Sequence, residues 1–487
     1  MTSDIFLTKI NESYIRVVCG AGIAQEISDH FTFDVPNAKF MPSYGKGMGS
    51  WDGKIRLLDR RNNTMLAGLA PRIVQWAKKN QYTIAVDDNL RTAEEFSLIE
   101  AEEFIRALNL PAHFDVRDYQ VRTLALAVRY KRKVILSPTA SGKSLSAYLI
   151  TRYFRKKTLI IVPTKSLVRQ MIGDFADYGY PDYIHGVMGG EERENLEADI
   201  IVSTWQSAVK MSNAYLSQFG VVIGDEAHIY TAKEIGSLLT RMSQTTIRVG
   251  MSGTLDGSKV HELQLEGHFG TVDRVATTKE LQERDILADL FIKIITFEHP
   301  EERRKRMASA EFEDEVKEII GCEARNRFIR NLALSLKGNT LILYARVDTH
   351  GEIIYNMLKE KAPDREVYYV HGGTHVDDRE ELRQIMEERT GVIGVTSFGT
   401  FQAGVNIKNI NNIIIAFGTK SVVRLLQSIG RELRRSKTKT FAKLFDLADD
   451  MSWKNKQNHT LRHLGERIKI YTNEEFPFEF FSITLKG

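Results

Sequence analysis

The sequence of 487 residues contains only two cysteines, Cys19 and Cys322. Two thiols exclude a disulfide framework or a four-cysteine metal site within one chain, so we expect a protein of a reducing, cytoplasmic compartment. No apolar run approaches the roughly 18 residues of a membrane-spanning helix, and the first residues lack the basic and apolar regions of a signal peptide. The sequence also shows no low-complexity segment, fixed-period repeat, His/Cys cluster or supported Ser-His-Asp arrangement.

Net charge is nearly balanced, at +4 for pH 7, which is too small to indicate nucleic-acid binding by itself. The distribution of charge is more informative. Residues 39–79 contain nine Lys or Arg and two Asp, residues 80–115 contain eight Asp or Glu and two Arg, and residues 431–469 contain eleven basic and five acidic residues. Such clustering predicts local anion-binding surfaces.

Two series of apolar runs alternate with helical patterns. The runs are 134–137, 158–163, 199–204, 221–226 and 247–254 in the first series, and 340–345, 366–373, 392–397, 411–418 and 443–448 in the second. Nearly continuous apolar strands separated by helices predict parallel sheets that helices cover on both faces. We therefore predict an α/β protein with tandem lobes at 111–290 and 291–487, the second with a basic C-terminal segment. A small α+β domain would precede them at 1–110, and the charged segment 300–320 predicts a solvated helix.

Local signals predict the elements of the first domain. Residues 50–58 predict a β-hairpin with Asp52-Gly53 as its turn. A helical pattern at 92–108 begins with Thr92 as a plausible N-cap, and Glu95 three residues later would complete a capping box.

A phosphate-loop motif, Ser-Pro-Thr-Ala-Ser-Gly-Lys-Ser, occupies residues 137–144 between a predicted strand and a predicted helix. Backbone N–H groups of such a loop bind phosphates, the lysine contacts the β and γ phosphates, and the hydroxyl binds Mg²⁺. We predict these last two roles for Lys143 and Ser144. Ser137 stands where the pattern expects a glycine, so the motif alone also fits a turn that merely begins a helix. The loop residues predicted to contact ATP are Thr139, Ala140, Ser141 and Gly142.

Asp225-Glu226-Ala227-His228 follows the apolar run Val221–Gly224. Carboxylates at the C-terminal end of a parallel strand face the crevice where α/β sheets bind ligands. We expect Asp225 to bind Mg²⁺, Glu226 to orient and deprotonate the attacking water, and His228 to respond to the γ-phosphate. The tetrapeptide alone also fits the start of a surface helix, but its place at the end of a buried strand favours the catalytic interpretation.

Further segments resemble motifs of the superfamily 2 helicases, over about residues 114–450. In chain order they are Arg117–Gln120, VPTKSL at 162–167, STWQS at 203–207, Ser252-Gly-Thr254, LYAR at 343–346, Thr396–Asn406 and Gln427–Arg434. In the same order, these segments resemble the Q motif, motif Ia, the segment that follows motif Ia, and motifs III, IV, V and VI. The motifs stand in the order in which the family has them. The resemblance implies two RecA-like lobes that bind ATP in the cleft between them and move along nucleic acid.

Two departures from the family pattern narrow the group. Motif V usually has Gly-x-Asp where this chain has Gly404-Val-Asn406, which leaves the role of Asn406 open. Motif VI begins with Gln427 rather than the His common in DEAD-box RNA helicases. This chain also has SGT at 252–254 where that group has SAT, and DEAH at 225–228 where that group has DEAD. The set looks closer to DNA helicases of the XPB and RecG type, and the whole chain is similar to a phage helicase of recombination and repair.

The resemblance implies roles for residues that no local pattern explains. It places Arg117, Gln120, Gly404 and Gln427 at the nucleotide, with Gln120 reading adenine. Arg431 and Arg434 would reach ATP from the second lobe, because a guanidinium forks onto phosphate oxygens and stays charged. As an arginine finger, Arg434 would contribute ~10³–10⁵ in rate. The alternative for both arginines is a basic turn of a surface helix.

Predicted DNA contacts fall in two groups. By family analogy, contacts to phosphate and sugar come from Thr164, Lys165, Thr204, His371 and Thr396. Trp205 would stack on a base or pack in the core. The segment 39–61 combines basic residues with aromatics and glycines, and Lys54, Arg56, Arg60 and Arg61 are its predicted DNA contacts. The alternative is a small core hairpin with Trp51 buried and its charges solvated.

The sequence thus predicts an ATP- and Mg²⁺-dependent DNA helicase. The resemblance implies branched substrates, which are Holliday junctions, stalled forks and R-loops, in recombination, repair and replication. Expected partners are branched, duplex and single-stranded DNA and RNA–DNA hybrids, with no membrane and an open oligomeric state. Alternatives are a duplex translocase that never separates strands, an RNA helicase, and an ATP-gated strand-annealing scaffold.

Overall fold

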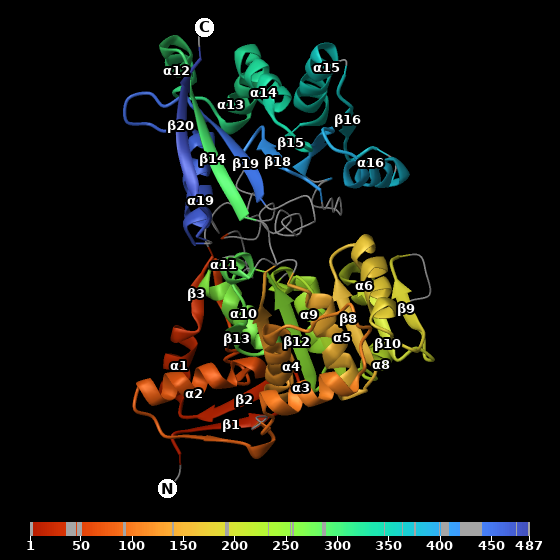
Figure 1. Ribbon diagram of the computed structural model, residues 1–487. Coiled ribbons are helices and arrows are strands. Elements are labelled where there is room, and N and C mark those ends of the chain that lie inside the picture. Colours follow the sequence, from red (N-terminus) through yellow and green to blue (C-terminus); the bar gives the residue numbers. More distant parts are fainter. Residues whose placement is uncertain are drawn as a thin grey trace. The chain divides into compact units, whose positions relative to one another are not determined.

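The computed structural model describes residues 3–35, 45, 51–90, 94–138, 141–189, 194–231, 233–253, 255, 258–284, 289–344, 346–362, 364–374, 376–398, 400, 409–418, 441–473 and 475–485. The chain divides into two compact units, Met1–Ser137 with Ser141–Ala276, and Pro138–Ala140 with Thr277–Gly487 (Figure 1). The N-terminal residues therefore share a unit with the first lobe. No helix among the described residues is long and apolar enough to cross a membrane.

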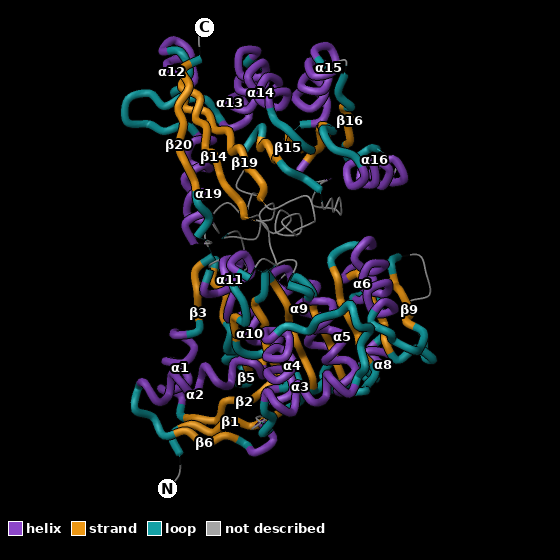
Figure 2. Tube along the Cα trace, viewed as in Figure 1, coloured by secondary structure: helices purple, strands orange, loops and turns teal. Residues whose placement is uncertain are grey.

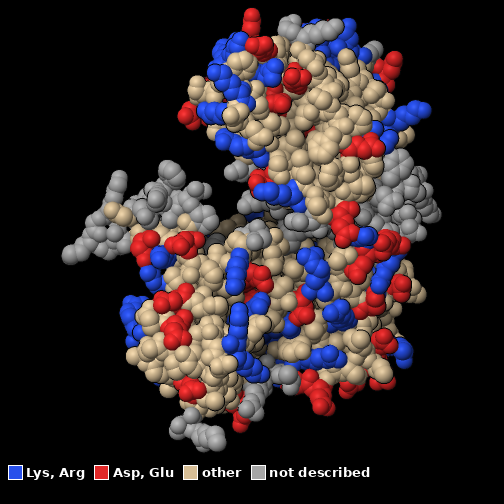
Figure 3. Space-filling model, turned by 90° about the vertical axis from the view of Figure 1, so that its left-hand side faces the viewer, with Lys and Arg blue, Asp and Glu red and all other residues tan. Residues whose placement is uncertain are grey.

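A four-stranded sheet in the order β5-β2-β1-β6 organises the N-terminal residues (Figure 2). Its strands are β1 (Ile5–Lys9), β2 (Tyr14–Cys19), β5 (Thr64–Leu66) and β6 (Ile84–Val86), and helices α1 (Ala21–His30) and α2 (Ala70–Lys79) pack on it. Alternation along β1 and β2 buries Ile5, Leu7, Ile15 and Val17 on one face. We call residues 3–90 the N-terminal module. The side of the molecule that carries α1 and α2 shows Lys and Arg interspersed with Asp and Glu (Figure 3).

The predicted hairpin at residues 50–58 is wrong. Strand β4 (Lys54–Arg56) pairs with β3 (Thr32–Asp34), which lies far upstream, and Phe33 faces Ile55. Gly53 has a φ of 79°, and the Asp52 carboxylate accepts a hydrogen bond from the Lys54 N–H at 3.2 Å. The Asp-Gly pair therefore makes a local turn at the entrance to β4 and does not join it to a preceding strand.

The helix predicted at 92–108 starts further along than expected, because residues 94–97 are not helical; Thr92, its predicted N-cap, lies outside the described residues. Helix α3 (Leu98–Ala107) begins later, and Ser97 is its N-cap. The Ser97 hydroxyl accepts from the Glu100 N–H at 3.1 Å, while the Glu100 carboxylate accepts from the Ser97 N–H at 2.6 Å. The Ser97–Glu100 pair has the same spacing as Thr92 and Glu95, and it stands directly before the apolar residues that pack on the next helix.

The first lobe contains a fully parallel sheet in the order β13-β7-β12-β11-β8-β10-β9. Its strands are β7 (Arg132–Leu136), β8 (Thr158–Val162), β9 (Ile184–Val187), β10 (Ile200–Thr204), β11 (Val221–Gly224), β12 (Ile247–Ser252) and β13 (Val272–Arg274). The helices are α4 (Asp118–Tyr130), α5 (Lys143–Phe154), α6 (Lys165–Asp177), α7 (Trp205–Ala208), α8 (Asn213–Leu216), α9 (Lys233–Arg241) and α10 (Lys259–Phe269). All five predicted apolar runs of this series form strands, and they occupy the interior of the sheet.

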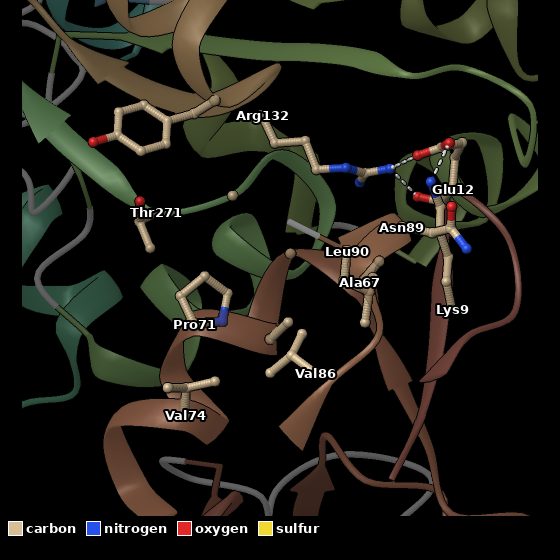
Figure 4. A pocket seen from close by; sticks show the side chains of 14 residues that line it. Lys9, Glu12, Ala67, Pro71, Val74, Val86, Asn89, Leu90, Arg132 and Thr271 are labelled. Atoms are coloured by element: carbon tan, nitrogen blue, oxygen red, sulfur yellow. Dashed lines mark hydrogen bonds and ion pairs between the residues drawn. The ribbon is translucent and has the colours of Figure 1, made fainter. Parts of the chain in front are cut away.

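The N-terminal module is fixed to the first lobe by packing and by partly buried ion pairs. Arg72 of α2 donates two hydrogen bonds of 2.7 Å to the carboxylate of Glu266 in α10, whose side chain is fully buried. Arg132 at the start of β7 donates to the Glu12 carboxylate at 2.7 Å (Figure 4). Leu263 of α10 belongs to the apolar core of the module. Beside the Arg132–Glu12 pair lies a mostly apolar cavity of about 300 Å³, shown in Figure 4.

The second lobe repeats this architecture, with the parallel order β16-β17-β15-β18-β19-β14-β20. Its strands are β14 (Asp289–Glu298), β15 (Thr340–Tyr344), β16 (Val367–Val370), β17 (Ile393–Ser397), β18 (Asn412–Ile415), β19 (Phe441–Asp450) and β20 (Phe478–Thr484). Its helices are α11 (Thr278–Glu283), α12 (Glu301–Met307), α13 (Phe312–Ile320), α14 (Glu323–Ser335), α15 (Glu352–Lys361), α16 (Val376–Glu388) and α19 (His459–Asn473). The charged segment 300–320 forms α12 and α13, and α13 buries Val316, Ile319 and Ile320, so it is not only a solvated helix. The predicted fold class, two RecA-like parallel-sheet lobes with a small α+β N-terminal part, is confirmed.

Candidate nucleotide-binding site

The predicted phosphate loop and the DEAH residues meet at one edge of the first lobe's sheet. Strands β7, β12 and β11 are neighbours, and all three end at this edge because they are parallel. The loop leaves β7 at Ser137, whose N–H donates to the Ser252 carbonyl at the end of β12 at 2.9 Å. Asp225 follows β11, and its N–H donates to the carbonyl of Ile161 in β8 at 2.9 Å. The geometry is the strand-end crevice in which α/β sheets bind ligands.

Gly142 turns the loop into helix α5. Its φ of 81° lies in the left-handed region, and a Cβ at this position would stand 2.5 Å from the Gln120 Nε2. Only glycine satisfies both conditions without strain. Ser137, at the position of the missing glycine, is buried and donates its hydroxyl hydrogen bond to the buried Ser141 hydroxyl. The substitution is therefore accommodated by a local hydrogen bond.

Gln120 supports the phosphate loop from helix α4. Its amide nitrogen donates to the carbonyls of Ser141 at 3.0 Å and Gly142 at 3.3 Å, and its amide oxygen accepts from the Arg117 N–H at 2.9 Å. The side chain is 2% exposed. The Gln120 side chain thus connects the predicted Q motif to backbone carbonyls of the predicted phosphate loop.

Lys143 and Glu226 face each other across the crevice. The Lys143 Nζ lies 3.7 Å from Glu226 Oε1, with both side chains largely buried. The ammonium donates no hydrogen bond to any residue that the structure describes. Glu226 has a φ of 51°, and a non-glycine residue in this region is commonly held there for function. A buried ammonium beside a carboxylate provides the donor and the base that a phosphate ester and an attacking water require.

The donor set at this edge fits a Mg²⁺–nucleotide complex. Mg²⁺ keeps several waters and takes one or two protein oxygens together with phosphate oxygens. The Ser144 hydroxyl at the start of α5 and the Asp225 carboxylate supply such oxygens, and Lys143 supplies a buried cation for the phosphates. Among the described residues, no group of three or more His, Cys, Asp or Glu forms a separate metal site.

His228 connects the DEAH residues to the end of β12. Its Nδ1 lies 3.0 Å from the Ser252 hydroxyl and 3.5 Å from Glu226 Oε2, and its backbone carbonyl lies 2.6 Å from the Nε2 of His261 in α10. A change at Glu226 can therefore reach Ser252 through the His228 side chain and α10 through the His228 backbone.

Two tyrosines at the site were not predicted from the sequence. The Tyr178 hydroxyl lies 2.9 Å from the Ser144 hydroxyl, and Tyr178 packs on Phe114 and Tyr148. Tyr230 is fully buried and donates to the Ile161 carbonyl at 2.7 Å. Burial, followed by the charges of Asp225 and Glu226, raises the pKa of Tyr230 well above its usual value. Neither tyrosine lies in a motif, so only the fold brings them to the site.

The predicted DNA contacts of the first lobe lie at strand ends on the same sheet. Thr164 is the N-cap of α6 and accepts from the Leu167 N–H at 3.4 Å, while Lys165 is exposed beside it. Thr204 is 5% exposed, and its hydroxyl donates to Ser207 at 3.1 Å. Trp205 is partly buried against the core of the lobe, which favours packing as its role.

In the second lobe, two predicted contacts are described. His371 follows β16 and accepts a hydrogen bond at Nδ1 from the Gly373 N–H at 3.1 Å. Thr396 lies in β17 and is 1% exposed. The remaining predicted nucleotide residues lie outside the described residues: Thr139, Ala140, Gly404, Gln427, Arg431 and Arg434.

The predicted basic contacts of the N-terminal module surround β4. The Lys54 Nζ lies 3.9 Å from Asp34, Arg56 pairs with Asp52 at 2.5 Å, and Arg61 pairs with Asp59 at 3.0 Å. Arg60 donates to the Gln25 amide oxygen at 2.7 Å. Trp51 is partly exposed and donates its indole N–H to the Lys54 carbonyl at 2.7 Å, so it is not a buried core residue. All four cations are at the surface, where a phosphate can replace a weak ion-pair partner.

Comparison with protein families gives three matches along the chain. The family described as DNA helicase UvsW, N-terminal, matches residues 4–87. The family of the res subunit of type III restriction enzymes matches residues 113–257, and the helicase conserved C-terminal domain matches residues 324–436.

Individual relatives extend over most of the chain. The ATP-dependent DNA helicase uvsW of Enterobacteria phage T4 is 31% identical over 97% of this chain and 98% of its own length. The crystal structure of T4 UvsW matches with a TM-score of 0.51 at 30% identity and covers 99% of this chain and 100% of that chain. The DNA 3'-5' translocase XPB2 of Sulfurisphaera tokodaii is 24% identical over 74% of this chain and 90% of its own length.

Proposed function

This chain belongs to the UvsW family, whose members are ATP-dependent DNA helicases of superfamily 2, and we propose that it remodels branched DNA. The proposed substrates are Holliday junctions, stalled forks and R-loops. ATP and DNA are its substrates. The observation that carries the proposal is the likeness to the phage helicase along the whole chain, including the N-terminal module that generic helicase lobes lack. Since that relative is a phage protein, we place the activity inside a host cell.

The proposed hydrolysis step uses the residues at the strand-end crevice. Lys143 binds the β and γ phosphates, and Glu226 accepts a proton from the water that attacks the γ-phosphorus. Mg²⁺, held by Ser144 and Asp225, would neutralise phosphate charge. Arg431 and Arg434 would approach from the second lobe, where a guanidinium stabilises the charge of the transition state. Because hydrolysis would need both lobes, closure of the lobes would be coupled to movement along DNA.

Substrate choice is assigned to the N-terminal module. The Arg72–Glu266 and Arg132–Glu12 contacts hold the module against the first lobe, so we infer that it moves with that lobe during the ATP cycle. The basic residues around β4 would then keep a fixed position relative to the first lobe while DNA passes. Such an arrangement suits a surface that holds one arm of a branched substrate.

A second candidate is a duplex translocase that does not separate strands, which the likeness to a protein named as a translocase favours. The test measures ATP hydrolysis with single-stranded, duplex and four-way-junction DNA in parallel, together with strand separation. The proposal expects the highest stimulation by junctions and ATP-dependent strand separation. Stimulation by linear duplex alone, without strand separation, would favour the translocase, and stimulation by RNA alone would contradict DNA as the substrate.

A further inference from the structure

A cavity of about 520 Å³ lies between the N-terminal module and helix α10 of the first lobe. This volume is within the roughly 300–1,000 Å³ of typical small-ligand sites. Residues at the end of α1 and along α2 and α10 line it, among them His30, Phe31, Trp76, Lys79, Lys259 and Leu263. No motif of the ATP site includes any of them, and the residues all belong to one compact unit.

The lining separates an aromatic floor from a cationic rim. Phe31, Trp76 and Leu263 are each less than 10% exposed, and they form the floor. His30 is exposed, with its ring 4.9 Å from the Phe31 ring and 6.2 Å from the Trp76 ring. The exposed His30 ring, backed by this buried floor, offers a ring face to a planar apolar group.

Two lysines of the rim are available for an anion. Arg72 forms ion pairs with Glu262 and Glu266, so its positive charge is already neutralised. Lys79 and Lys259 are both exposed, and within the part of the chain that the structure describes neither forms an ion pair. Both lysines line the cavity together with His30. Partial burial lowers the pKa of His30, and the charges of Lys259 and Lys79 lower it further.

The cavity also lies at the root of the basic strand pair. Phe31 leads directly into β3, and its carbonyl accepts from the Leu57 N–H just after β4 at 3.0 Å. DNA bound by Lys54 and Arg56 of β4 would therefore lie beside the cavity. A base and a phosphate combine a planar apolar face with a negative charge, and single-stranded sites in proteins combine aromatic surfaces with cations for this reason.

We propose that this cavity binds one nucleotide of single-stranded DNA, with its phosphate between Lys79 and Lys259 and its base against His30 and the aromatic floor. The inference rests on the proposed function and names the part of the substrate that the N-terminal module holds. A duplex backbone keeps its bases stacked inside, so the cavity selects the unpaired strand of a branched substrate. Gln75, exposed on the wall, supplies an amide for the base edge.

The first test measures binding of a fluorescein-labelled oligothymidylate by anisotropy across a range of salt concentrations. Lys79→Ala/Lys259→Ala is expected to bind at least tenfold more weakly, with a log–log salt slope shallower by about 0.7 for each phosphate that the variant no longer neutralises. Lys78→Ala is the matched control, because Lys78 is an exposed lysine on the same helix that does not line the cavity. Equal affinity and slope for the double variant and the control would overturn the proposal.

A second test does not depend on affinity. A photo-crosslinking residue placed at Gln75 is expected to label the oligothymidylate, and the same residue at Arg16, exposed on β2 of the same module, is not. Unlabelled single strand should suppress the crosslink, and blunt duplex should not. Equal competition by blunt duplex, or stronger competition by an acidic peptide, would overturn the assignment to an unpaired nucleotide.

These outcomes are distinguishable from failure of the proposed function. Crosslinking at position 75 by a protein that never separates junction arms would retain the cavity site and remove the proposed remodelling of branched DNA. If the parent protein separates junctions but the double variant binds single strands as the parent does, the function is retained and the cavity site is removed.

Discussion

At the scale of single residues, the proposed hydrolysis step depends most directly on Glu226. Its strained backbone and its contact with Lys143 hold the carboxylate at the strand-end crevice, where we propose that it deprotonates the attacking water. We expect Glu226→Gln to bind ATP with unchanged affinity and to hydrolyse it ~10²–10⁴ times more slowly, because the general base is removed. Lys143→Ala should instead weaken ATP binding. Equilibrium binding and steady-state hydrolysis separate the two, and near-parental turnover by Glu226→Gln would remove its catalytic assignment.

Gly142 gives a second prediction at this scale. Gly142→Ala places a methyl group in the left-handed region and against the Gln120 amide, so the loop must move and ATP binding should weaken at least tenfold. Gly173→Ala, in helix α6 with open space around it, is the control and should be neutral or stabilising by about 0.5–1 kcal/mol. Unchanged ATP affinity in Gly142→Ala would show that the loop does not need this conformation.

Local sequence predicted where the described candidate residues of the ATP site lie in the fold, because that position depends on short motifs. Asp225 and Glu226 directly follow β11, and Lys143 and Ser144 begin α5 after the loop that leaves β7, so each position follows from an apolar run and a following motif. Tyr178 could not be predicted, since the contact with Ser144 depends on how α6 packs on α5.

At the scale of elements, the attachment of α2 to α10 is a testable feature. Arg72→Ala leaves the buried Glu266 carboxylate without its main partner, and we expect a decrease of about 2 kcal/mol in the free energy of unfolding, less than for a fully buried pair because Arg72 is 35% exposed. Arg61→Ala, whose side chain is 90% exposed, should leave the free energy of unfolding unchanged, because a surface ion pair contributes little. Urea unfolding measures both, and equal stabilities would show that the ion pair does not hold the module.

The basic residues around β4 give the next prediction. Lys54→Ala/Arg56→Ala/Arg60→Ala/Arg61→Ala should bind four-way junctions more weakly, with a salt slope shallower by about 0.9 for each duplex phosphate that the variant no longer neutralises. ATP hydrolysis without DNA should not change.

The matched control for this variant removes four ion-paired surface cations of the second lobe, Lys305, Arg306, Lys317 and Arg327. Circular dichroism checks folding of both proteins. If junction affinity and slope stay as in the parent, these residues are not the DNA-selecting surface, and the basic segment 431–469 is the next candidate.

Helices and strands were predicted well where the sequence has a continuous run of apolar residues. They were predicted poorly where one local pattern fits two different structures. The sequence offers capping-box patterns at both Thr92 and Ser97; Thr92 lies outside the described residues, and α3, which packs on α4, begins with the Ser97 cap. Strand β4 was paired with the wrong partner because the true one, β3, is distant along the chain. The outer strands β9 and β13 are short, and β9 contains Gly186, so neither gave an apolar run.

At the scale of the whole molecule, the two-lobe architecture followed from the sequence because parallel sheets need long apolar runs separated by helices. The sequence did not indicate that the N-terminal module and the first lobe form one compact unit. That association depends on pairs such as Arg132–Glu12, which are 120 residues apart and belong to no motif. The proposed motor is therefore a first lobe with a fixed DNA-holding module and a second lobe that completes the ATP site.

The central claim is that ATP hydrolysis, completed by both lobes, separates the arms of branched DNA. The most direct measurement follows a labelled four-way junction with the parent protein, Glu226→Gln and Arg434→Ala, each with and without ATP. We expect ATP-dependent separation into duplex products by the parent, and junction binding without products by both variants, since one lacks the base and the other lacks the arginine finger. Products formed at the parental rate by either variant, or junction-stimulated hydrolysis by the parent without any products, would contradict the claim.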